Sequence, residues 1–411
     1  MSAPVWRNRV VLTVSLVVAV SYTGIGMVVP VRLLYAQSHG ASLAVIGAMA
    51  SAFLLANFIF QYPTGWLADR WGRRPVMLCG LGAQVALAFA YLAITDPIAF
   101  VALRFIEGAV AASVLPSARA LIADNAAPEE QGQAYGLFGA CLNAGFLLGP
   151  ALGGVIAGLG YASAFVGSGL LRLAALALVL LVVHDDRRGR QREGHAGRER
   201  RLPPATSRRA LLAAPLVGAY ILAAGDNLYF GFDLALMPLW LRGHLGATVT
   251  AIGLVYAVWA VPNILGAPLG GRLADRLRRS SLILVGGLLQ APLYVSYGLL
   301  TSLAPLVVLF ALHGVVYALM QPAVDATLAA AAPPGLQARV QGLYSAVGLA
   351  SAFVAANALT VLYGIDYRLP LFVMAAGFGL CVLVGGTLIR LAERHGGRTA
   401  DATAAQHGVA R

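Results

Sequence analysis

Long apolar runs separated by short polar segments make up most of the chain. A helix needs about 20 residues to cross roughly 30 Å of hydrocarbon, and twelve runs reach that length. The predicted membrane-spanning segments are residues 10–33, 44–68, 75–95, 98–122, 133–158, 161–183, 212–241, 249–271, 281–301, 304–330, 338–363 and 367–391. The pattern therefore predicts an all-α membrane protein with twelve transmembrane helices.

One polar connection occurs twice in the chain. Residues 65–77 read GWLADRWGRRPVM and link the second and third predicted spans. Six of these residues recur 206 positions later, as Gly271, Leu273, Ala274, Asp275, Arg276 and Arg279. A constant offset of this size indicates a duplicated unit. We therefore expect two pseudo-symmetric six-helix bundles at 1–183 and 211–393, joined by an arginine-rich linker at 184–210 and followed by a tail at 394–411.

Composition agrees with a membrane protein and excludes several enzyme classes. Hydrophobic residues make up 59% of the chain and charged residues 11%, and the mean hydropathy is +0.77. Because no lysine occurs, the chain has no Walker lysine, Schiff-base lysine or lysine nucleophile. We expect no enzyme activity and no cofactor, so that uphill transport would draw on a proton gradient. Cys79, Cys141 and Cys381 lie in predicted spans at unrelated spacings, which favours buried thiols over a disulfide or metal site.

The distribution of arginines predicts the orientation. Of the 29 arginines, 24 fall in the termini and alternate connections on one side, whereas Arg32, Arg242 and Arg368 fall on the other. Cytoplasmic loops are enriched in basic residues, so we expect both termini in the cytoplasm and the chain in a bacterial inner membrane. The linker carries nine arginines without interleaved aromatic residues. This composition favours contact with anionic lipid headgroups over nucleic-acid binding.

Charged residues inside predicted spans mark candidate transport sites, because placing them in hydrocarbon is costly. Arg104 and Glu107 are three residues apart near mid-membrane, so they share a helix face and can pair. Glu107 is then either a proton-coupling group or half of a permanently ionised pair. Arg172 has no acid within one helical turn. Its partner is either an anionic substrate group or an acid from another helix, such as Glu107.

The seventh predicted span carries two acids on one face. Asp226 and Asp233 are seven residues apart, with Tyr229 and Phe230 between them. Acids in a membrane helix need water, a proton or a cation, and aromatic rings attract cations. The pattern predicts a site that recognises a proton or a lipophilic cation. The alternative is pairing of the two acids with the membrane-embedded arginines across a central cavity.

Other polar residues in the spans are candidates for lining a cavity or for hydrogen bonds in the core. His313 occupies the position of Glu107 in the second copy, either as a hydrogen-bonded core residue or as a titrating group. Tyr22, Asn57 and Asn143 are the candidate cavity residues in the first bundle. For the first span, close helix packing through small residues is the alternative.

The repeated connection resembles a motif of the major facilitator superfamily. The pattern Gly-x-Leu-Ala-Asp-Arg-x-Gly-Arg-Arg, which includes Arg70, is similar to the family's loop between helices 2 and 3. The twelve spans and the duplication extend this resemblance over nearly the whole chain. It implies that Asp69, Arg73 and an acid at the end of the fourth span, Asp124, hold the cytoplasmic side closed in the outward-open state. The alternative is that these arginines only contact lipid phosphates.

The second copy of this motif is incomplete. It retains Asp275 and Arg279, but Ala330 stands where the acid of the fourth span would recur. We expect this copy to contribute less to gating. Arg119 and Asp325 occupy equivalent positions near the cytoplasmic ends of their spans, and we expect a salt bridge between them when the cytoplasmic side closes.

The fifth predicted span contains GFLLGPALGG at 145–154. Gly145, Gly149 and Gly153 recur every four residues on one face, and Pro150 removes a backbone donor. Together with Gly154, these residues resemble the antiporter signature of drug and proton exporters in the superfamily, Gly-x-x-x-Gly-Pro-x-x-Gly-Gly. The alternative is a general packing face of small residues. The RFIEG sequence of the fourth span is similar to the family's Arg-x-x-Gln-Gly, with a glutamate in place of the usual amide.

The resemblance implies a major facilitator fold that works by alternating access. The expected function is proton-coupled export of small, lipophilic, cationic compounds by a chain that acts as a monomer in the bilayer. One alternative is a lipid or glycolipid flippase or a metabolite exporter on the same fold, in which the buried arginines hold an anionic group. Another is a transport-inactive sensor or scaffold.

Overall fold

The computed structural model describes residues 8–126, 131–183, 211–333 and 336–408, and all regular structure in these ranges is helical. The predicted linker at 184–210 lies outside the described residues. The first half comprises α1 (Arg9–Met27), α2 (Val29–Ser38), α3 (Leu43–Trp71), α4 (Arg73–Ala93), α5 (Pro97–Asn125), α6 (Gln131–Ile156), the 3-10 turn η3 (Ala157–Leu159) and α7 (Tyr161–Val182). The second half comprises α10 (Ala214–Ala235), α11 (Met237–Leu245), α12 (Val249–Arg276), α13 (Arg279–Leu299), α14 (Leu303–Ala331), α15 (Gln337–Ile365) and α16 (Leu369–Gly408).

Eleven segments of the described chain are long and apolar enough to cross a membrane. They correspond to all of the predicted spans except the seventh. In that place lies α10, which is 22 residues long. Its acids Asp226 and Asp233, with Asn227, lower its mean hydropathy. The length of α10 suits a membrane helix, while its composition is that of a helix with a polar face.

Two predicted spans, 10–33 and 212–241, are each broken into two helices. The first breaks at Val28 and the second at Leu236, and each following helix has a proline near its start. A proline lacks the backbone N–H and its ring clashes with the preceding turn, so Pro30 and Pro238 explain the breaks. The last helix was expected to end before the tail at 394–411, whereas α16 continues to Gly408.

The packing of the two halves follows the duplication seen in the sequence. In the first half α1 packs against α6 and α7, and α3 packs against α5; in the second half α10 packs against α15 and α16, and α12 against α14. The start of α3 is capped by Ser42 and the start of α12 by Thr248, 206 residues later, each accepting a hydrogen bond from a backbone N–H. Such caps satisfy donors that a helix start leaves free.

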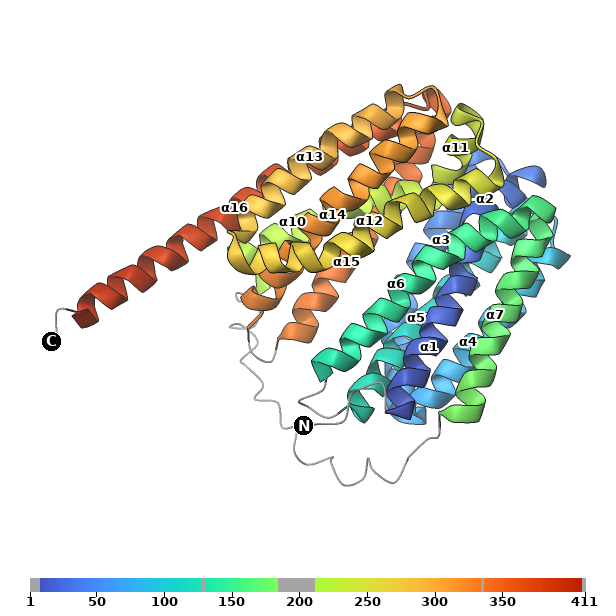
Figure 1. The fold of residues 1–411 in the computed structure, drawn as a ribbon. Coiled ribbons are helices and arrows are strands. Elements are labelled where there is room, and N and C mark those ends of the chain that lie inside the picture. Colours follow the sequence, from blue (N-terminus) through green and yellow to red (C-terminus); the bar gives the residue numbers. More distant parts are fainter. Residues whose placement is uncertain (1–7, 127–130, 184–210, 334–335, 409–411) are drawn as a thin grey trace.

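The halves meet along two related helix crossings. Where α6 crosses α12, Thr250 donates a hydrogen bond of 3.0 Å to the carbonyl of Gly154, and a Cβ on Gly154 would lie 2.9 Å from Gly253 Cα. Where α3 crosses α15, Asn357 donates a hydrogen bond of 2.6 Å to Ser51 Oγ. Both crossings lie near α2 and α11, and the helices diverge toward the opposite end (Figure 1). We call these two crossings the inter-half crossings.

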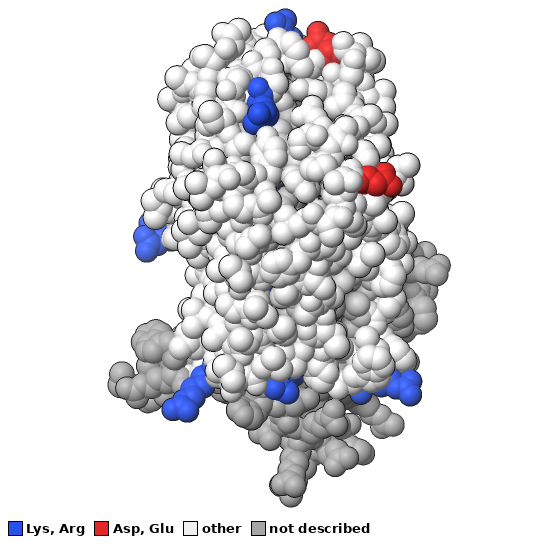
Figure 2. Space-filling model, turned by 90° about the vertical axis from the view of Figure 1, so that its right-hand side faces the viewer, with Lys and Arg blue, Asp and Glu red and all other residues white. Residues whose placement is uncertain are grey.

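The surface between the two ends is mostly uncharged. In the view of Figure 2, basic side chains gather along the lower edge, and only a few charged residues lie elsewhere on this face. Many large apolar side chains are exposed, among them Leu265, Val308 and Leu380. An apolar surface of this extent is suited to contact with lipid.

The glycine face of α6 packs directly on α1. A Cβ on Gly149 would lie 2.7 Å from Gly26 Cα, and one on Gly153 would overlap the carbonyl of Met27. Gly145 belongs to the same contact, so these glycines form the packing face of small residues that was the alternative interpretation of the motif. Gly154 points to a different neighbour, Gly253 of α12. The motif therefore joins α6 to its own half and, through its last glycine, to the second half.

We expect Gly153→Ala to lower the midpoint of thermal unfolding in detergent. The added methyl group must separate α6 from α1, and overpacking of this kind costs about 1–3 kcal/mol. The matched control is Gly139→Ala on the same helix, where a Cβ meets nothing within 4 Å and replacing glycine is expected to be neutral or stabilising. Equal midpoints for the two variants would contradict the assigned packing.

Candidate functional site

A carboxylate in the middle of α5 is surrounded by arginines from three helices. Arg104 donates to Glu107 Oε2 at 2.9 Å. Arg32 of α2 donates to Oε1 of the same carboxylate at 3.0 Å, and Arg172 of α7 lies 3.8 Å from Oε1. The hydroxyl of Tyr91 on α4 donates to Oε2 at 3.2 Å. We call these five residues the Glu107 cluster.

The Glu107 cluster is almost completely closed off from solvent. Glu107 is 5% exposed, and its arginine partners are 2–6% exposed. Arg172 also donates to the carbonyl of Gln84 at 3.0 Å, and the Arg104 guanidinium lies 4.1 Å from the centre of the Phe53 ring. Cation–π contact and backbone carbonyls offset part of the cost of burying these charges.

The pairing predicted for Arg104 and Glu107 is present, and Arg172 has an acid from another helix as its partner. Of the two roles considered for Glu107, this arrangement favours the permanently ionised one. The expectation that Arg32 lies in an external connection is wrong, because the chain re-enters a helix after Val28 and buries Arg32. One carboxylate faces three guanidinium groups, so the first half carries surplus positive charge at its centre.

The acids of α10 are not ion-paired in the described part of the chain. Tyr317 of α14 donates to Asp226 Oδ2 at 3.4 Å. Asp233 Oδ1 is buried without a hydrogen-bond partner, and the Tyr256 hydroxyl lies near Asp233 without reaching hydrogen-bond geometry. This conformation therefore contains no direct salt bridge between these acids and the described arginines of the first half.

Aromatic side chains surround His313 in the second half. Tyr229 and Tyr294 each meet its ring edge-on at 5.4 Å between centroids, and Trp259 lies at 6.2 Å. Tyr297 forms a hydrogen bond of 3.0 Å with Nδ1, while Nε2 is buried without a partner. His313 is thus a hydrogen-bonded core residue inside an aromatic enclosure that also contains the Tyr229 predicted beside the acids.

The two clusters occupy equivalent positions of the duplicated halves. At an offset of 206 residues, Glu107 corresponds to His313 and Tyr91 to Tyr297, and each tyrosine bonds to the residue 16 positions later. The arginines of the first cluster correspond to other residue types, with Arg104 replaced by the aromatic Phe310. The second half has therefore kept the tyrosine contact and exchanged charge for aromatic surface.

A small cavity lies where the charged face of the first half meets the second half. It is lined by Val29, Arg32, Leu33, Arg104, Asp233 and Leu234 and has a volume of about 20 Å³, enough for about one water molecule. Its lining includes Asp233 and two arginines of the Glu107 cluster, with no ion pair between them. A larger cavity of about 600 Å³ lies elsewhere, beside η3 and the start of α12, away from the buried acids.

The residues predicted to gate the cytoplasmic side are only partly described. The side chains of Asp69 and Asp124 lie outside the described residues, so the proposed network of Asp69, Arg73 and Asp124 stays a prediction. Arg70 lies over the Trp66 ring, with 5.4 Å from its guanidinium carbon to the ring centre.

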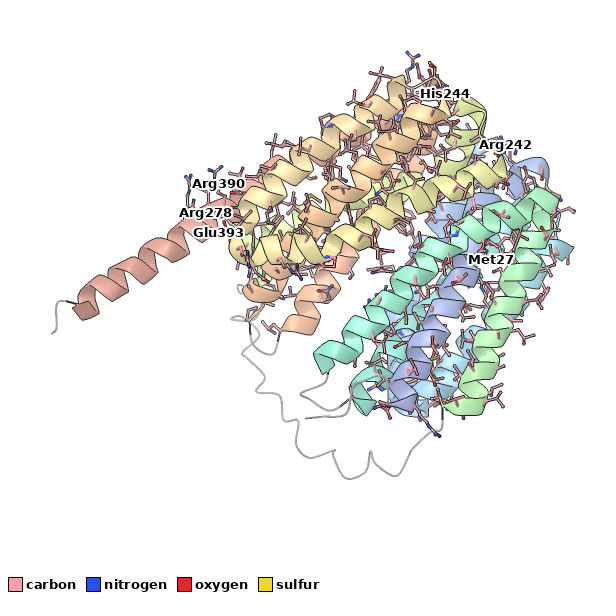
Figure 3. All side chains as sticks on the ribbon, viewed as in Figure 1. Met27, Arg242, His244, Arg278, Arg390 and Glu393 are labelled. Atoms are coloured by element: carbon pink, nitrogen blue, oxygen red, sulfur yellow. The ribbon has the colours of Figure 1, made fainter. Side chains whose placement is uncertain are left out.

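In the second copy, the carboxylate that accepts hydrogen bonds from the first turn of α13 comes from α16. Glu393 accepts hydrogen bonds from the backbone N–H of Ser280 at 3.2 Å and from its hydroxyl at 2.5 Å. Figure 3 shows Glu393 with Arg278 and Arg390 at this end of the second half. Arg279 donates to the carbonyl of Ala326 at 2.9 Å, whereas Asp275 is exposed.

Arg119 and Asp325 do not form the expected salt bridge in this conformation. Both side chains are exposed, and Asp325 accepts a hydrogen bond of 3.0 Å from Gln321 of its own helix. The expectation concerned the state in which the cytoplasmic side is closed. The described contacts between the halves lie at the other end, so the two charges are separated here.

The candidate cavity residues have different surroundings. Tyr22 packs edge-on against Phe146 at 5.0 Å between ring centroids, and Asn57 donates to the carbonyl of Gly108 at 3.3 Å. Asn143 and Phe230 are exposed. Tyr22 and Asn57 thus contribute to helix contacts.

The thiols are free, but one expectation about them is wrong. Cys79 is exposed, because it lies on the outer face of α4, while Cys141 and Cys381 are partly buried. The described residues contain no group of three or more His, Cys, Asp or Glu side chains that could hold a metal ion.

Sequence reasoning missed Arg32, Tyr91 and Glu393. A signal for Tyr91 was present, since Tyr91 and Tyr297 recur at the offset of 206, as do Gln84 and Gln290. Polar residues that recur inside apolar spans indicate positions with a common role. No comparable signal marks Arg32 or Glu393, because each acts through a helix distant in sequence.

The helices and the buried charges define a class of protein: a multi-pass helical membrane protein of two related halves, with ionisable residues in its interior. The family model of the Major Facilitator Superfamily matches residues 14–236 and 228–411. The chain belongs to this superfamily of membrane transporters.

Individual relatives match part of the chain. The quinolone resistance protein NorA of Staphylococcus aureus is 29% identical over 167 residues, which are 41% of this chain and 43% of the relative. An uncharacterized MFS-type transporter of Methanocaldococcus jannaschii is 29% identical over 163 residues, 39% of this chain and 42% of the relative. The chain thus spans less than half the length of these curated relatives.

Solved structures share the fold over almost the whole chain. A bacterial homologue of the human lysosomal transporter Spinster, in an inward-facing and unoccupied conformation, has a TM-score of 0.75 and 16% identity, covering 95% of this chain and 98% of its own. A D-xylose–proton symporter has a TM-score of 0.69 and 17% identity, covering 94% of this chain and 96% of its own. At these identities the likeness shows the fold alone.

We expect Glu107→Gln to destabilise the folded protein. The substitution leaves three buried guanidinium groups without a counter-charge, and removing one partner of a buried ion pair costs on the order of 3 kcal/mol. The measurement is the thermal unfolding midpoint in detergent, with Asp275→Asn as the control because Asp275 is exposed. A Glu107→Gln midpoint equal to that of the control would show that the cluster does not depend on this carboxylate.

Proposed function

We propose that this chain is a secondary active transporter that exports small, lipophilic, cationic compounds in exchange for protons. The observation that carries the proposal is the pair of carboxylates on α10. Asp226 and Asp233 have no ion pair in the described chain, and tyrosines from α12 and α14 lie beside them. Carboxylates in such a place need a proton or a cation.

In this proposal a proton and a cationic compound compete for the α10 acids. When both cannot be bound together, release of one accompanies binding of the other, and the two fluxes are coupled. The aromatic rings of Tyr229, Trp259 and Tyr317 offer apolar and cation–π contacts to a lipophilic substrate. No cofactor is required, and the energy comes from the proton gradient.

Glu107 has a different role from that of the α10 acids. With two guanidinium groups within 3.0 Å, its carboxylate is strongly favoured in the ionised form. We assign it the role of a fixed counter-ion. Arg104 and Arg172 then act on the α10 acids at a distance, by making the centre of the first half positive.

Alternating access would interconvert this conformation and its opposite. The inter-half crossings close one side, while the helices diverge at the opposite end, where α1 starts (Figure 1). With both termini in the cytoplasm of a bacterial inner membrane, this conformation opens to the cytoplasm. The partial similarity to NorA, whose name states quinolone resistance, favours a role in export. We propose that one chain suffices for transport.

A carrier for anionic lipids or metabolites is the second candidate. The observation in its favour is the surplus of positive charge at Arg32, Arg104 and Arg172 around one carboxylate. Proteoliposomes supplied in parallel with a lipophilic cationic dye and an anionic lipid analogue separate the two candidates. Absence of gradient-driven flux for every compound would instead favour a sensor or scaffold.

We expect Asp226→Asn and Asp233→Asn each to reduce proton-driven export of a cationic dye. A loss of roughly tenfold or more is expected, since this corresponds to only about 1.4 kcal/mol of lost interaction. The assay is dye flux in proteoliposomes with an imposed pH gradient, and Asp275→Asn is the control at an exposed site. Undiminished export by both α10 variants would rule out the proposed coupling.

We expect Asp69→Asn to impair export more than Asp275→Asn does. The reason is that the second copy of the loop lacks an acid at Ala330, where the first has Asp124. The same flux assay compares the two variants at matched protein levels. Equal losses would argue against an asymmetric gate.

A further inference from the structure

The cavity of about 600 Å³ beside the crossing of α6 and α12 has one wall from each half. Its volume lies within the range of small-molecule binding sites. The first half contributes residues between 157 and 161, where η3 meets α7, and the second half contributes Arg242 and residues 246–250 around the start of α12. Because the two walls belong to different halves, the cavity has this shape only while the halves are in contact at this end.

The charge of this cavity comes from one arginine. Among the described residues that line it, Arg242 alone is charged, and Figure 3 labels Arg242 at this end of the molecule. Arg242 is exposed and has no ion pair or hydrogen bond with the described part of the chain. The two other arginines predicted on this side are engaged, since Arg32 pairs with Glu107 at 3.0 Å and Arg368 donates to the Tyr367 hydroxyl at 2.7 Å. Arg242 is therefore available to an anion.

One aromatic ring in the wall of the cavity lacks a stacked partner. Tyr161 meets Tyr35 edge-on, with 6.4 Å between the ring centroids, and no described ring is stacked on it. Its counterpart 206 residues later, Tyr367, stacks on His244 with 3.8 Å between centroids. A tyrosine at this junction can thus hold a second ring, and Tyr161 can offer the same contact to a planar ligand.

The residue types that leave room and supply charge in this cavity are not repeated in the other half. Ala157, which lines the cavity, corresponds to Tyr363. Arg242 corresponds to Ala36, which is buried. The duplication therefore does not account for the combination of a small side chain and an unpaired arginine at this junction, whereas a ligand that needs both does.

We propose that this cavity binds a small aromatic anion, such as a carboxylate or sulfonate, with its acid group at Arg242 and its ring against Tyr161. A ligand that needs both walls binds this conformation in preference to the opposite one, and so stabilises the contact of the halves at this end. The ligand differs from the proposed export substrate, because Arg242 repels a cation. Only the placement of the cavity on the external side rests on the proposed function, through the orientation given there.

The test measures binding of a probe with the expected chemistry. Naphthalene-2-sulfonate is titrated calorimetrically into the full chain in nanodiscs of zwitterionic lipid, and empty nanodiscs correct for partition into the bilayer. Two further compounds each lack one feature of the probe. Methanesulfonate has the charge without the ring, and naphthalene-2-sulfonamide has the ring without the charge. We expect saturable binding of naphthalene-2-sulfonate and binding at least about tenfold weaker for the other two, since a hydrogen bond to a charged group is worth that much.

Variants of the cavity separate its two features. Arg242→Gln should weaken binding of naphthalene-2-sulfonate about tenfold or more, and Arg242→Lys should retain part of the affinity. Gly158→Trp should block the probe while keeping the charge, because Gly158 is exposed and a Cβ there meets only Thr250 Oγ1, at 3.5 Å. Arg368→Gln is the control at an arginine outside the cavity and should leave binding unchanged.

A cross-link tests the preference for this conformation. Ser51→Cys and Asn357→Cys replace two side chains that form a hydrogen bond between the halves. Joining them with a short bifunctional thiol reagent, after Cys79, Cys141 and Cys381 are replaced by serine, holds the halves in contact. The linked protein should bind the probe at least as tightly as the unlinked one, because the competent conformation is then always populated.

The proposal is overturned if naphthalene-2-sulfonate does not bind, if Arg242→Gln binds it as tightly as the parent does, or if cross-linking weakens binding. Equal binding of methanesulfonate or of the neutral sulfonamide would also overturn it. Since the assay contains no transport step, a failure to export cationic dyes leaves it intact, and the two proposals fail independently.

Discussion

Charge compensation at Glu107 is the constraint on which the first half depends. A guanidinium group in an apolar interior is tolerated only with an acid, a carbonyl or an aromatic ring beside it. Arg32, Arg104 and Arg172 come from three helices and converge on one carboxylate, and Tyr91 adds a fourth helix. A single side chain thus fixes the relative positions of α2, α4, α5 and α7. The half can then move as one unit, because separating its helices would expose unpaired charge.

The second half achieves its cohesion by a different means. Stacked and edge-on rings around His313 replace the ion pairs, and aromatic contacts tolerate small displacements better than buried ion pairs do. Several polar atoms in this half, including Asn263 Nδ2 and Trp259 Nε1, are buried without partners. Such atoms can form hydrogen bonds with a guest molecule at little cost to the fold. The described residues of this half include no buried arginine, and its interior is therefore the more adaptable of the two.

The fold was largely predictable from sequence because its determinants are local or periodic. Apolar length identified eleven of the spans, and the repeated loop indicated the related halves. The same reasoning predicted unbroken helices at 10–33 and 212–241. Pro30 and Pro238 did not change this prediction, because a proline in a membrane helix is often tolerated. Arg32 was misplaced as a consequence of the first error.

The candidate site was less predictable, because its contacts join distant parts of the chain. Arg104 and Glu107 were paired correctly from their spacing on one helix. The hydrogen bond from the start of α13 to Glu393 could not be predicted, since Glu393 lies 113 residues beyond Ser280. The unpaired state of Asp226 and Asp233 also depends on how the halves meet, which periodicity does not specify.

The divergence of the two clusters has a consequence for how such a chain arises. Two identical copies of the first half, facing each other, would bring two arginine surpluses together and repel. Two copies of the second half would place unpaired acids opposite each other and would also repel. Covalent fusion removes the need for either copy to recognise itself, so opposite charge can accumulate on the two sides. The exchange of Arg104 for Phe310 across the repeat is one position at which the two halves differ in charge.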